Sequence, residues 1–125
     1  MSVSTARRMA STIGLITAGI GGVLVVSPTT FGPLMSLADP RGARLIGAVD
    51  LALVPGLLAG RPRWPWMAAR AIGNVLTAAY CLGRAHDAEA VARARVVALV
   101  LAMATVADTV AALALRSDVR CAESN

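Results

Sequence analysis

Three polar side chains lie inside segments that are otherwise apolar enough to cross a membrane. They are Asp50, Asn74 and Asp108, and each lies near the middle of its segment. Burying a carboxylate in hydrocarbon costs roughly 2.5–3.5 kcal/mol on membrane-insertion scales, so such side chains normally face protein or a water-filled cavity. We therefore expect these residues to be turned away from lipid, and a functional role is their first interpretation.

Composition and length place the chain among integral membrane proteins. Of its 125 residues 57% are hydrophobic and only 15% are charged, and the mean hydropathy is +0.68. Soluble domains carry about 25% charged residues, and the helices of a soluble bundle would need charged outer stripes. The sequence therefore predicts an all-α, integral membrane four-helix bundle that forms a single domain over residues 1–125, with spans at about residues 9–26, 43–60, 66–83 and 94–115.

The connections between the spans indicate how the chain crosses the membrane. Residues 28–42 are rich in Pro and Gly and too polar to span, so we expect them at the membrane interface. Residues 61–66 combine arginine with tryptophan, which is typical of an interfacial anchor. With both termini cytoplasmic, seven arginines lie on the inner side and five on the outer side. The positive-inside rule therefore favours a multi-pass protein of the cell membrane with both termini in the cytoplasm.

The charges and cysteines point away from nucleic acids, metals and cofactors. The net charge of +5 comes from twelve basic residues, all arginine. They gather at the ends of the spans, whereas a nucleic-acid-binding protein needs a basic face. Cys81 and Cys121 show neither CxxC nor His spacing, and no P-loop, dinucleotide fingerprint or nucleophile elbow occurs. We therefore expect the lipid bilayer as a partner, and no nucleic acid, cofactor or metal.

The polar residues of the spans recur at helical spacing. Arg70 and Asn74 are one turn apart and share a face of the third span. If the faces with Asp50 and Asp108 also turn inward, the bundle encloses a polar pocket. Alternatively, the two acids pair with Arg70 or Asn74 simply to hold the helices together.

Two carboxyl groups in a pocket of low dielectric constant are suited to acid/base chemistry, because one can act as an acid and the other as a base. The leading hypothesis is a membrane enzyme that needs no cofactor and acts on an apolar small molecule, by epoxide opening, cyclisation or isomerisation. Asp50 and Asp108 would be acid and base, and Arg70 would hold a carboxylate. Asn74 and Tyr80 would orient water or substrate. This residue set resembles in chemical type the Asp–Arg–Asp cluster of the limonene epoxide hydrolase family, which has a different spacing and a soluble α+β fold.

Two other functions remain open at this stage. In a proton-coupled carrier or small channel, Asp50 and Asp108 would alternate between protonated and ionised states. Four short helices leave little room for an aqueous path, so this function would require a homodimer, with the small residues Gly14, Ala18 and Gly22 of the first span at the contact. An accessory subunit that only packs against a larger membrane complex is the third alternative.

One segment resembles a known family. Residues 44–56 read Arg-Leu-Ile-Gly-Ala-Val-Asp-Leu-Ala-Leu-Val-Pro-Gly. This is similar to the second helix of the small four-helix membrane proteins grouped as DoxX-like, which carries Arg-x-x-Gly-x-Arg-Asp-x-x-x-Gly. The chain departs from the pattern at Val49, where the family has arginine, and at Gly56, where the glycine is displaced. The resemblance implies a four-helix membrane fold and adds little about activity.

Overall fold

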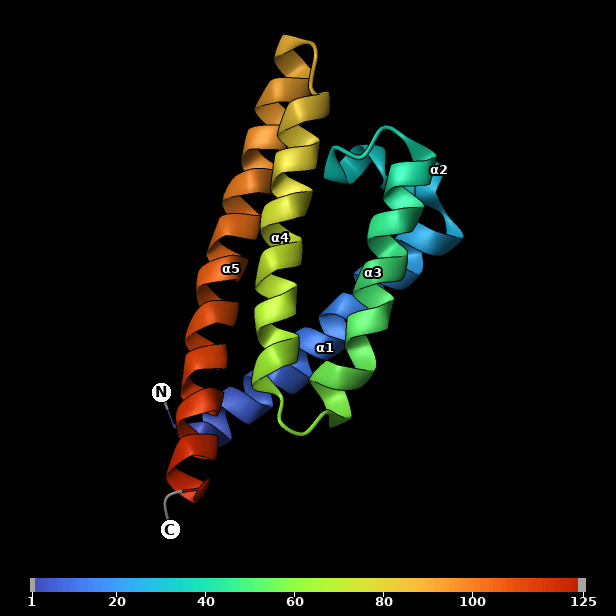
Figure 1. Cartoon of the computed structure of the whole chain (residues 1–125). Helices are drawn as coiled ribbons and strands as arrows, with labels where there is room; N and C mark the ends of the chain where they lie inside the picture. The colour runs from blue at the N-terminus through green and yellow to red at the C-terminus, as the bar shows by residue number, and fades with distance from the viewer. Residues whose placement is uncertain (1, 124–125) are drawn as a thin grey trace.

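A computed structural model of the chain describes residues 2–123, and this part of the protein is helical without a β-strand (Figure 1). A short helix α2 and a 3-10 turn η1 lie between the first two long helices. The elements are α1 (Val3–Val26), α2 (Pro28–Phe31), η1 (Pro33–Met35), α3 (Pro40–Ala59), α4 (Trp64–Arg84) and α5 (Ala88–Glu123). The all-α class is confirmed. The count of four helices is not, because part of the predicted connection at residues 28–42 forms the fifth helix, α2.

The long helices begin and end outside the apolar segments because polar residues cap or continue them. The backbone N–H of Thr5 donates to the side chain of Ser2 at the start of α1, at 3.3 Å. Asp39 caps α3 by accepting hydrogen bonds from the backbone N–H groups of Arg41 and Gly42, both at 3.1 Å. Hydropathy detects only the apolar centre of each helix, so the predicted spans are shorter than α1 and α5.

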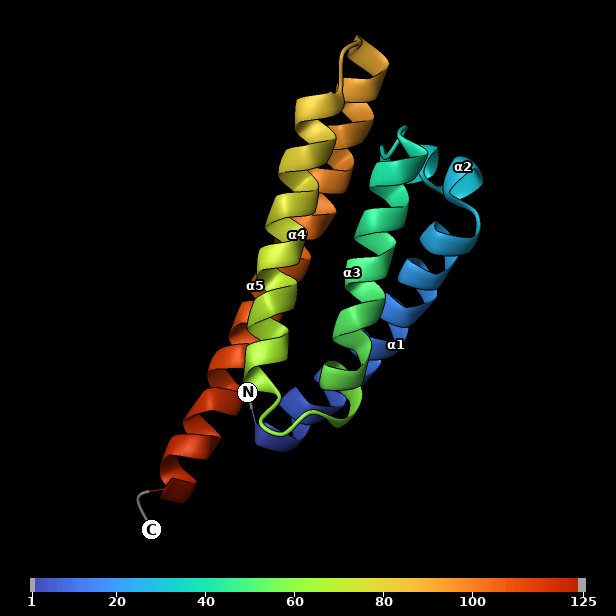
Figure 2. The same ribbon diagram turned by 45° about the vertical axis from the view of Figure 1, so that its right-hand side comes forward.

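The four long helices form two pairs (Figures 1 and 2). Helix α1 packs against α3, and α4 packs against α5. Both ends of the described chain and the α3–α4 connection lie at one end of the molecule, which we call the terminal end. Helix α2, η1 and the α4–α5 connection lie at the other, the loop end. An ion pair of 3.1 Å between Arg7 and Asp118 joins α1 to α5 at the terminal end.

Apolar side chains in this fold fill the core and also cover much of the outer surface. The buried polar residues are Thr17, Asn74 and Asp108, whereas many large apolar side chains are exposed on all four long helices. Three helices are long and apolar enough to cross a membrane: α1, α3 and the stretch of α5 from Ala88 to Cys121. Helix α4 is not in this set. The structure therefore agrees with a membrane protein and supports three of the four predicted spans by length and hydropathy.

Helices α1 and α3 meet backbone to backbone at two glycines. A Cβ atom on Gly21 would lie 2.9 Å from the Gly47 carbonyl oxygen, and one on Gly47 would lie 2.8 Å from the Gly21 carbonyl oxygen. Of the small residues predicted at a homodimer contact, Gly14 packs on α3, but a Cβ atom on Gly22 would meet nothing within 4 Å. The glycines of α1 that contact α3 are Gly14 and Gly21, which are seven residues apart. The predicted contact residues Gly14, Ala18 and Gly22 are instead spaced by four. Because Gly14 is already covered by α3, it is not available for a homodimer contact.

This packing makes a testable difference between two adjacent glycines. We expect Gly21→Ala to lower the free energy of unfolding by about 1–3 kcal/mol, because the added methyl group overpacks a backbone contact. The matched control Gly22→Ala is expected to change it little, or to raise it by up to about 1 kcal/mol through better helix propensity. Unfolding in detergent followed by circular dichroism measures both. Equal effects of the two substitutions would show that α1 and α3 do not meet at Gly21.

Candidate functional site

The centre of the polar cluster is Asp108 on α5, whose side chain is 1% exposed. The side-chain amide of Asn74 donates a hydrogen bond of 2.9 Å to its Oδ2 atom. The Nε atom of Arg70 lies 3.5 Å from the same oxygen. Arg70 and Asn74 are one turn apart on α4, so a single face of α4 presents both groups to α5. The predicted meeting of these three residues is therefore present in the structure.

Arg70 is shared between two acids. Its side chain is 12% exposed, and its buried Nε atom contacts Asp108 as an ion without making a hydrogen bond to any described residue. Arg70 also lines a small cavity together with Asp50 on α3. Helix α4 thus places one cation between an acid on each of two neighbouring helices. Asp50 on α3 and Asp108 on α5 are therefore both near Arg70, one through a shared cavity and the other through an ion pair.

A small cavity of about 50 Å³ lies beside this cluster, and we call it the inner cavity. Its polar lining consists of Asp50, Arg70, Asn74, Thr17 and Thr77. A water molecule occupies about 30 Å³ in the liquid, whereas pockets for organic ligands measure about 300–1,000 Å³. The inner cavity therefore has room for one or two water molecules or a small reacting group, and not for a whole organic substrate.

A second, apolar hollow of about 220 Å³ lies between α3 and α4, and we call it the lateral groove. Its outer rim is formed by the exposed side chains of Leu45, Val49 and Leu76. Asp50 and Thr77 line both the lateral groove and the inner cavity. Asp50 therefore stands where an apolar surface open to the outside meets the enclosed polar cluster.

Tyr80 lies apart from the polar cluster but in the same groove as Asp50. Its hydroxyl donates a hydrogen bond of 3.4 Å to Asp39, at the loop end. Hydrogen bonds from the backbone N–H groups of Arg41 and Gly42 hold the pKa of Asp39 below its usual value, and the Tyr80 hydroxyl acts in the same direction. Tyr80, expected together with Asn74 to orient water or substrate, therefore lies at the loop end of the lateral groove.

Two features of the site could not be read from the sequence pattern. Thr17 on α1 is 1% exposed and lines the inner cavity, but its hydroxyl is bound to the Ile13 carbonyl oxygen at 2.8 Å. A threonine in an apolar helix gives no signal that separates this arrangement from an ordinary core position. The hydroxyl of Thr105 on α5 likewise donates to a backbone oxygen of its own helix, the carbonyl oxygen of Leu101, at 2.8 Å. Within residues 2–123, no three His, Cys, Asp or Glu side chains gather as metal ligands would.

Comparison with known proteins assigns no family. No protein-family model, curated protein or solved structure gives a significant match to this chain. The similarity of residues 44–56 to the DoxX-like proteins therefore stays a prediction. The described residues form an all-helical protein with three helices that are long and apolar enough to cross a membrane. At its centre Asp108 contacts Arg70 and Asn74, beside a small cavity that Asp50 also lines.

Proposed function

We propose that the chain is an integral protein of the cell membrane in which α4 is the fourth span. The polar residues that lower the hydropathy of α4 are Arg70 and Asn74, and both are turned inward. The outward face of the same helix carries the exposed residues Ile72, Val75 and Leu76. The surface that α4 would present to lipid therefore includes a row of large apolar side chains. The excess of arginine at the terminal end favours cytoplasmic termini.

This topology predicts that the loop end and the terminal end are reached from opposite sides of the membrane. In a protein carrying Cys81→Ala and Cys121→Ser, Asp87→Cys is expected to react with a membrane-impermeant maleimide in intact cells. Ser2→Cys in the same background is expected to react only after the cells are permeabilised. Equal reactivity of the two positions in intact cells would contradict the three spans α1, α3 and α4 between them.

The protein in this proposal is an enzyme for acid/base chemistry on an apolar small molecule taken from the bilayer. The observation that carries it is the position of Asp50, which lines the lateral groove on one side and the polar inner cavity on the other. A substrate lying in the groove would meet Asp50, and the inner cavity has room for the water molecule or small group that reacts with it. Neither step requires a metal or an organic cofactor.

Asp50 and Asp108 have different roles in this mechanism. Asp108 does not line the groove or the inner cavity, and it fixes Asn74 and Arg70. It is therefore a positioning residue, and Asp50 is the group that reacts. With one guanidinium for two carboxyl groups, the cluster is electrically balanced when one carboxyl group carries a proton. In the proposed mechanism, Asp50 exchanges this proton with the substrate.

Epoxide opening illustrates the proton balance. Asp50 accepts a proton from water while the water oxygen attacks a ring carbon and the carbon–oxygen bond of the ring breaks. The same carboxyl group then returns the proton to the former ring oxygen, which gives a diol. In an isomerisation, Asp50 removes a proton from one carbon and returns it to another. Both reactions leave Asp50 in its starting state.

Reconstitution in vesicles separates this proposal from the alternatives. Purified protein is incubated with a panel of apolar epoxides and alkenes, and products are identified by mass spectrometry with ¹⁸O-labelled water. A chemically changed product supports the enzyme. Movement of an unchanged solute under a pH gradient would indicate a proton-coupled carrier instead, and the absence of both activities would indicate an accessory subunit. The small inner cavity and the covered Gly14 offer little support for the carrier or for its homodimer.

A further inference from the structure

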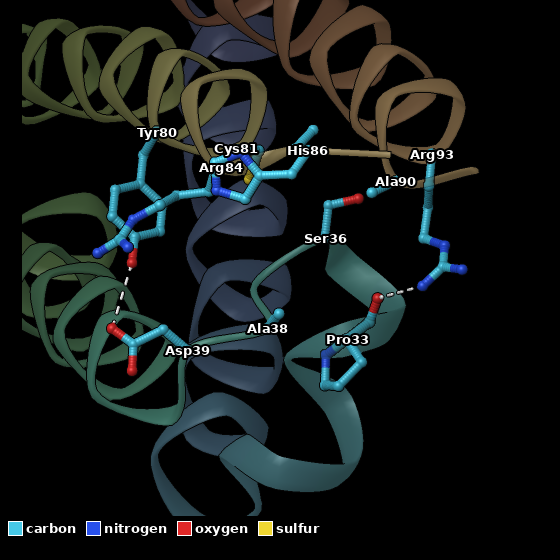
Figure 3. A pocket seen from close by; sticks show the side chains of 11 residues that line it. Pro33, Ser36, Ala38, Asp39, Tyr80, Cys81, Arg84, His86, Ala90 and Arg93 are labelled. Carbon is cyan, nitrogen blue, oxygen red and sulfur yellow. Dashed lines mark hydrogen bonds between the residues drawn. The ribbon is translucent and has the colours of Figure 1, made fainter. Parts of the chain in front are cut away.

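A larger hollow of about 390 Å³ lies at the loop end, and we call it the mouth pocket (Figure 3). It is formed where the C-terminal end of α4 and the start of α5 face η1 and the start of α3. Its polar lining consists of Ser36, Asp39, Tyr80, Arg84, His86 and Arg93. None of these residues belongs to the Asp108 cluster.

The charges around the mouth pocket leave one arginine available. Asp39 is occupied by backbone N–H groups and by the Tyr80 hydroxyl. Arg93 is occupied by Glu89 at 2.7 Å and by the Pro33 carbonyl oxygen. Arg84 stacks over the ring of Tyr80, with 5.4 Å to the ring centroid. The Arg84 charge helps to lower the pKa of Asp39, but no described residue accepts a hydrogen bond from the guanidinium group. Arg84 can therefore donate to a ligand.

A buried hydroxyl adds a second donor. The Oγ atom of Ser36 is inaccessible to solvent and has no hydrogen-bond partner among the described residues. Ser36 adopts a left-handed backbone conformation, with φ 60°, directly after η1. Burying a hydroxyl without a partner is unfavourable, and an acceptor oxygen in the pocket would remove that cost. His86 projects over the same pocket in Figure 3, and its ring N–H can also donate.

The mouth pocket and the lateral groove meet at Tyr80, which lines both. The groove continues from Tyr80 along α4 to Gly73, level with Asp50. At 1.5 Å per helical residue, Gly73 lies roughly 10 Å along the axis from Tyr80 and roughly 16 Å from Arg84. The two hollows together therefore offer donors at one end, an apolar wall in the middle, and the carboxyl group of Asp50 at the far end.

We propose that the ligand of this composite site is an anionic amphiphile. Its carboxylate or phosphate head binds Arg84, His86 and Ser36 in the mouth pocket, because charge-assisted hydrogen bonds from arginine recognise such oxyanions. Its apolar chain lies in the lateral groove, with the reacting bond at Asp50, roughly 10–16 Å from the head. The assignment of the ligand as substrate rests on the proposed function; the binding itself does not.

Binding measurements test the head site directly. Purified protein in nanodiscs of zwitterionic lipid is titrated with a fluorescent 16-carbon fatty acid and with its methyl ester. The carboxylate is expected to bind at least about tenfold more tightly than the ester, since the ester cannot form a charge-assisted bond. Arg84→Gln and Ser36→Ala are expected to reduce this preference. The matched control Arg95→Gln removes an exposed charge at the same end, outside the pocket, and is expected to leave the preference intact.

Further measurements distinguish failure of the head site from failure of the proposed function. If Arg84→Gln and Ser36→Ala keep their normal unfolding temperature and leave the preference unchanged, the head site is wrong, whatever the activity. Inorganic phosphate is also tested as a competitor of the fluorescent fatty acid. If phosphate binds with the same affinity as the fatty acid, and Leu76→Ser in the groove does not weaken fatty-acid binding, the ligand is a free oxyanion rather than an amphiphile. If the preference depends on Arg84 but no amphiphile is converted, the head site stands and the proposed function fails.

Discussion

Replacing Asp50 with asparagine is expected to lower turnover by about 10²–10⁴-fold, the usual contribution of a general acid or base. Asparagine has nearly the same shape but cannot accept and return a proton in the reaction. Asp50 makes no hydrogen bond to another described side chain, so the substitution leaves no partner unsatisfied. The fold and the binding of an identified substrate should therefore survive, and the loss should fall on kcat rather than on KM.

Two matched substitutions complete this experiment. Asp118→Asn removes an exposed carboxylate at the terminal end and is expected to leave turnover unchanged. Asp108→Asn should reduce kcat less than Asp50→Asn and should also alter the pH dependence of kcat, because Asp108 acts through Arg70 and Asn74. Full turnover by Asp50→Asn would end the assignment of Asp50 as the reacting group, even with the fold unchanged.

The polar cluster was predictable because it depends on short-range geometry. Arg70 and Asn74 share a face by helical spacing, and the short α4–α5 connection makes α5 the antiparallel neighbour of α4. A buried acid on the face of α5 that packs on α4 is then expected to contact the cation and the amide of α4. The cost of leaving Asp108 unpaired in an apolar environment supplies the rest of the argument.

Other features could not be predicted because they depend on the rotation of one helix against another. Gly21 and Gly22 are adjacent glycines that the sequence pattern does not distinguish. The packing of α1 on α3 decides that Gly21, and not Gly22, meets Gly47. Tyr80 lies two turns from Asn74 on the sequence pattern, but the course of residues 28–39 brings Asp39 to its hydroxyl. The mouth pocket depends on the same loop, so the sequence alone left Arg84 and His86 as ordinary polar residues near a membrane edge.

The same cluster makes a prediction about stability. Arg70→Met is expected to lower the free energy of unfolding by about 3–5 kcal/mol, because it leaves a buried carboxylate without its cation. The double substitution Arg70→Met with Asp108→Asn is expected to recover most of that loss, since a neutral amide beside Asn74 needs no counter-ion. Equilibrium unfolding in detergent, followed by circular dichroism, of the wild type, the two single variants and the double variant gives the four values needed for a double-mutant cycle.

The exposed pair between Arg7 and Asp118 provides the control. Its side chains are 62% and 38% exposed, and Arg7→Gln is expected to change stability by no more than about 1 kcal/mol. The two arginines thus differ in burial and not in the kind of partner. If Arg70→Met cost as little as Arg7→Gln, water would have to reach Asp108. The cluster would then lack the low dielectric constant that the acid/base proposal requires, and the proposal would lose its physical basis.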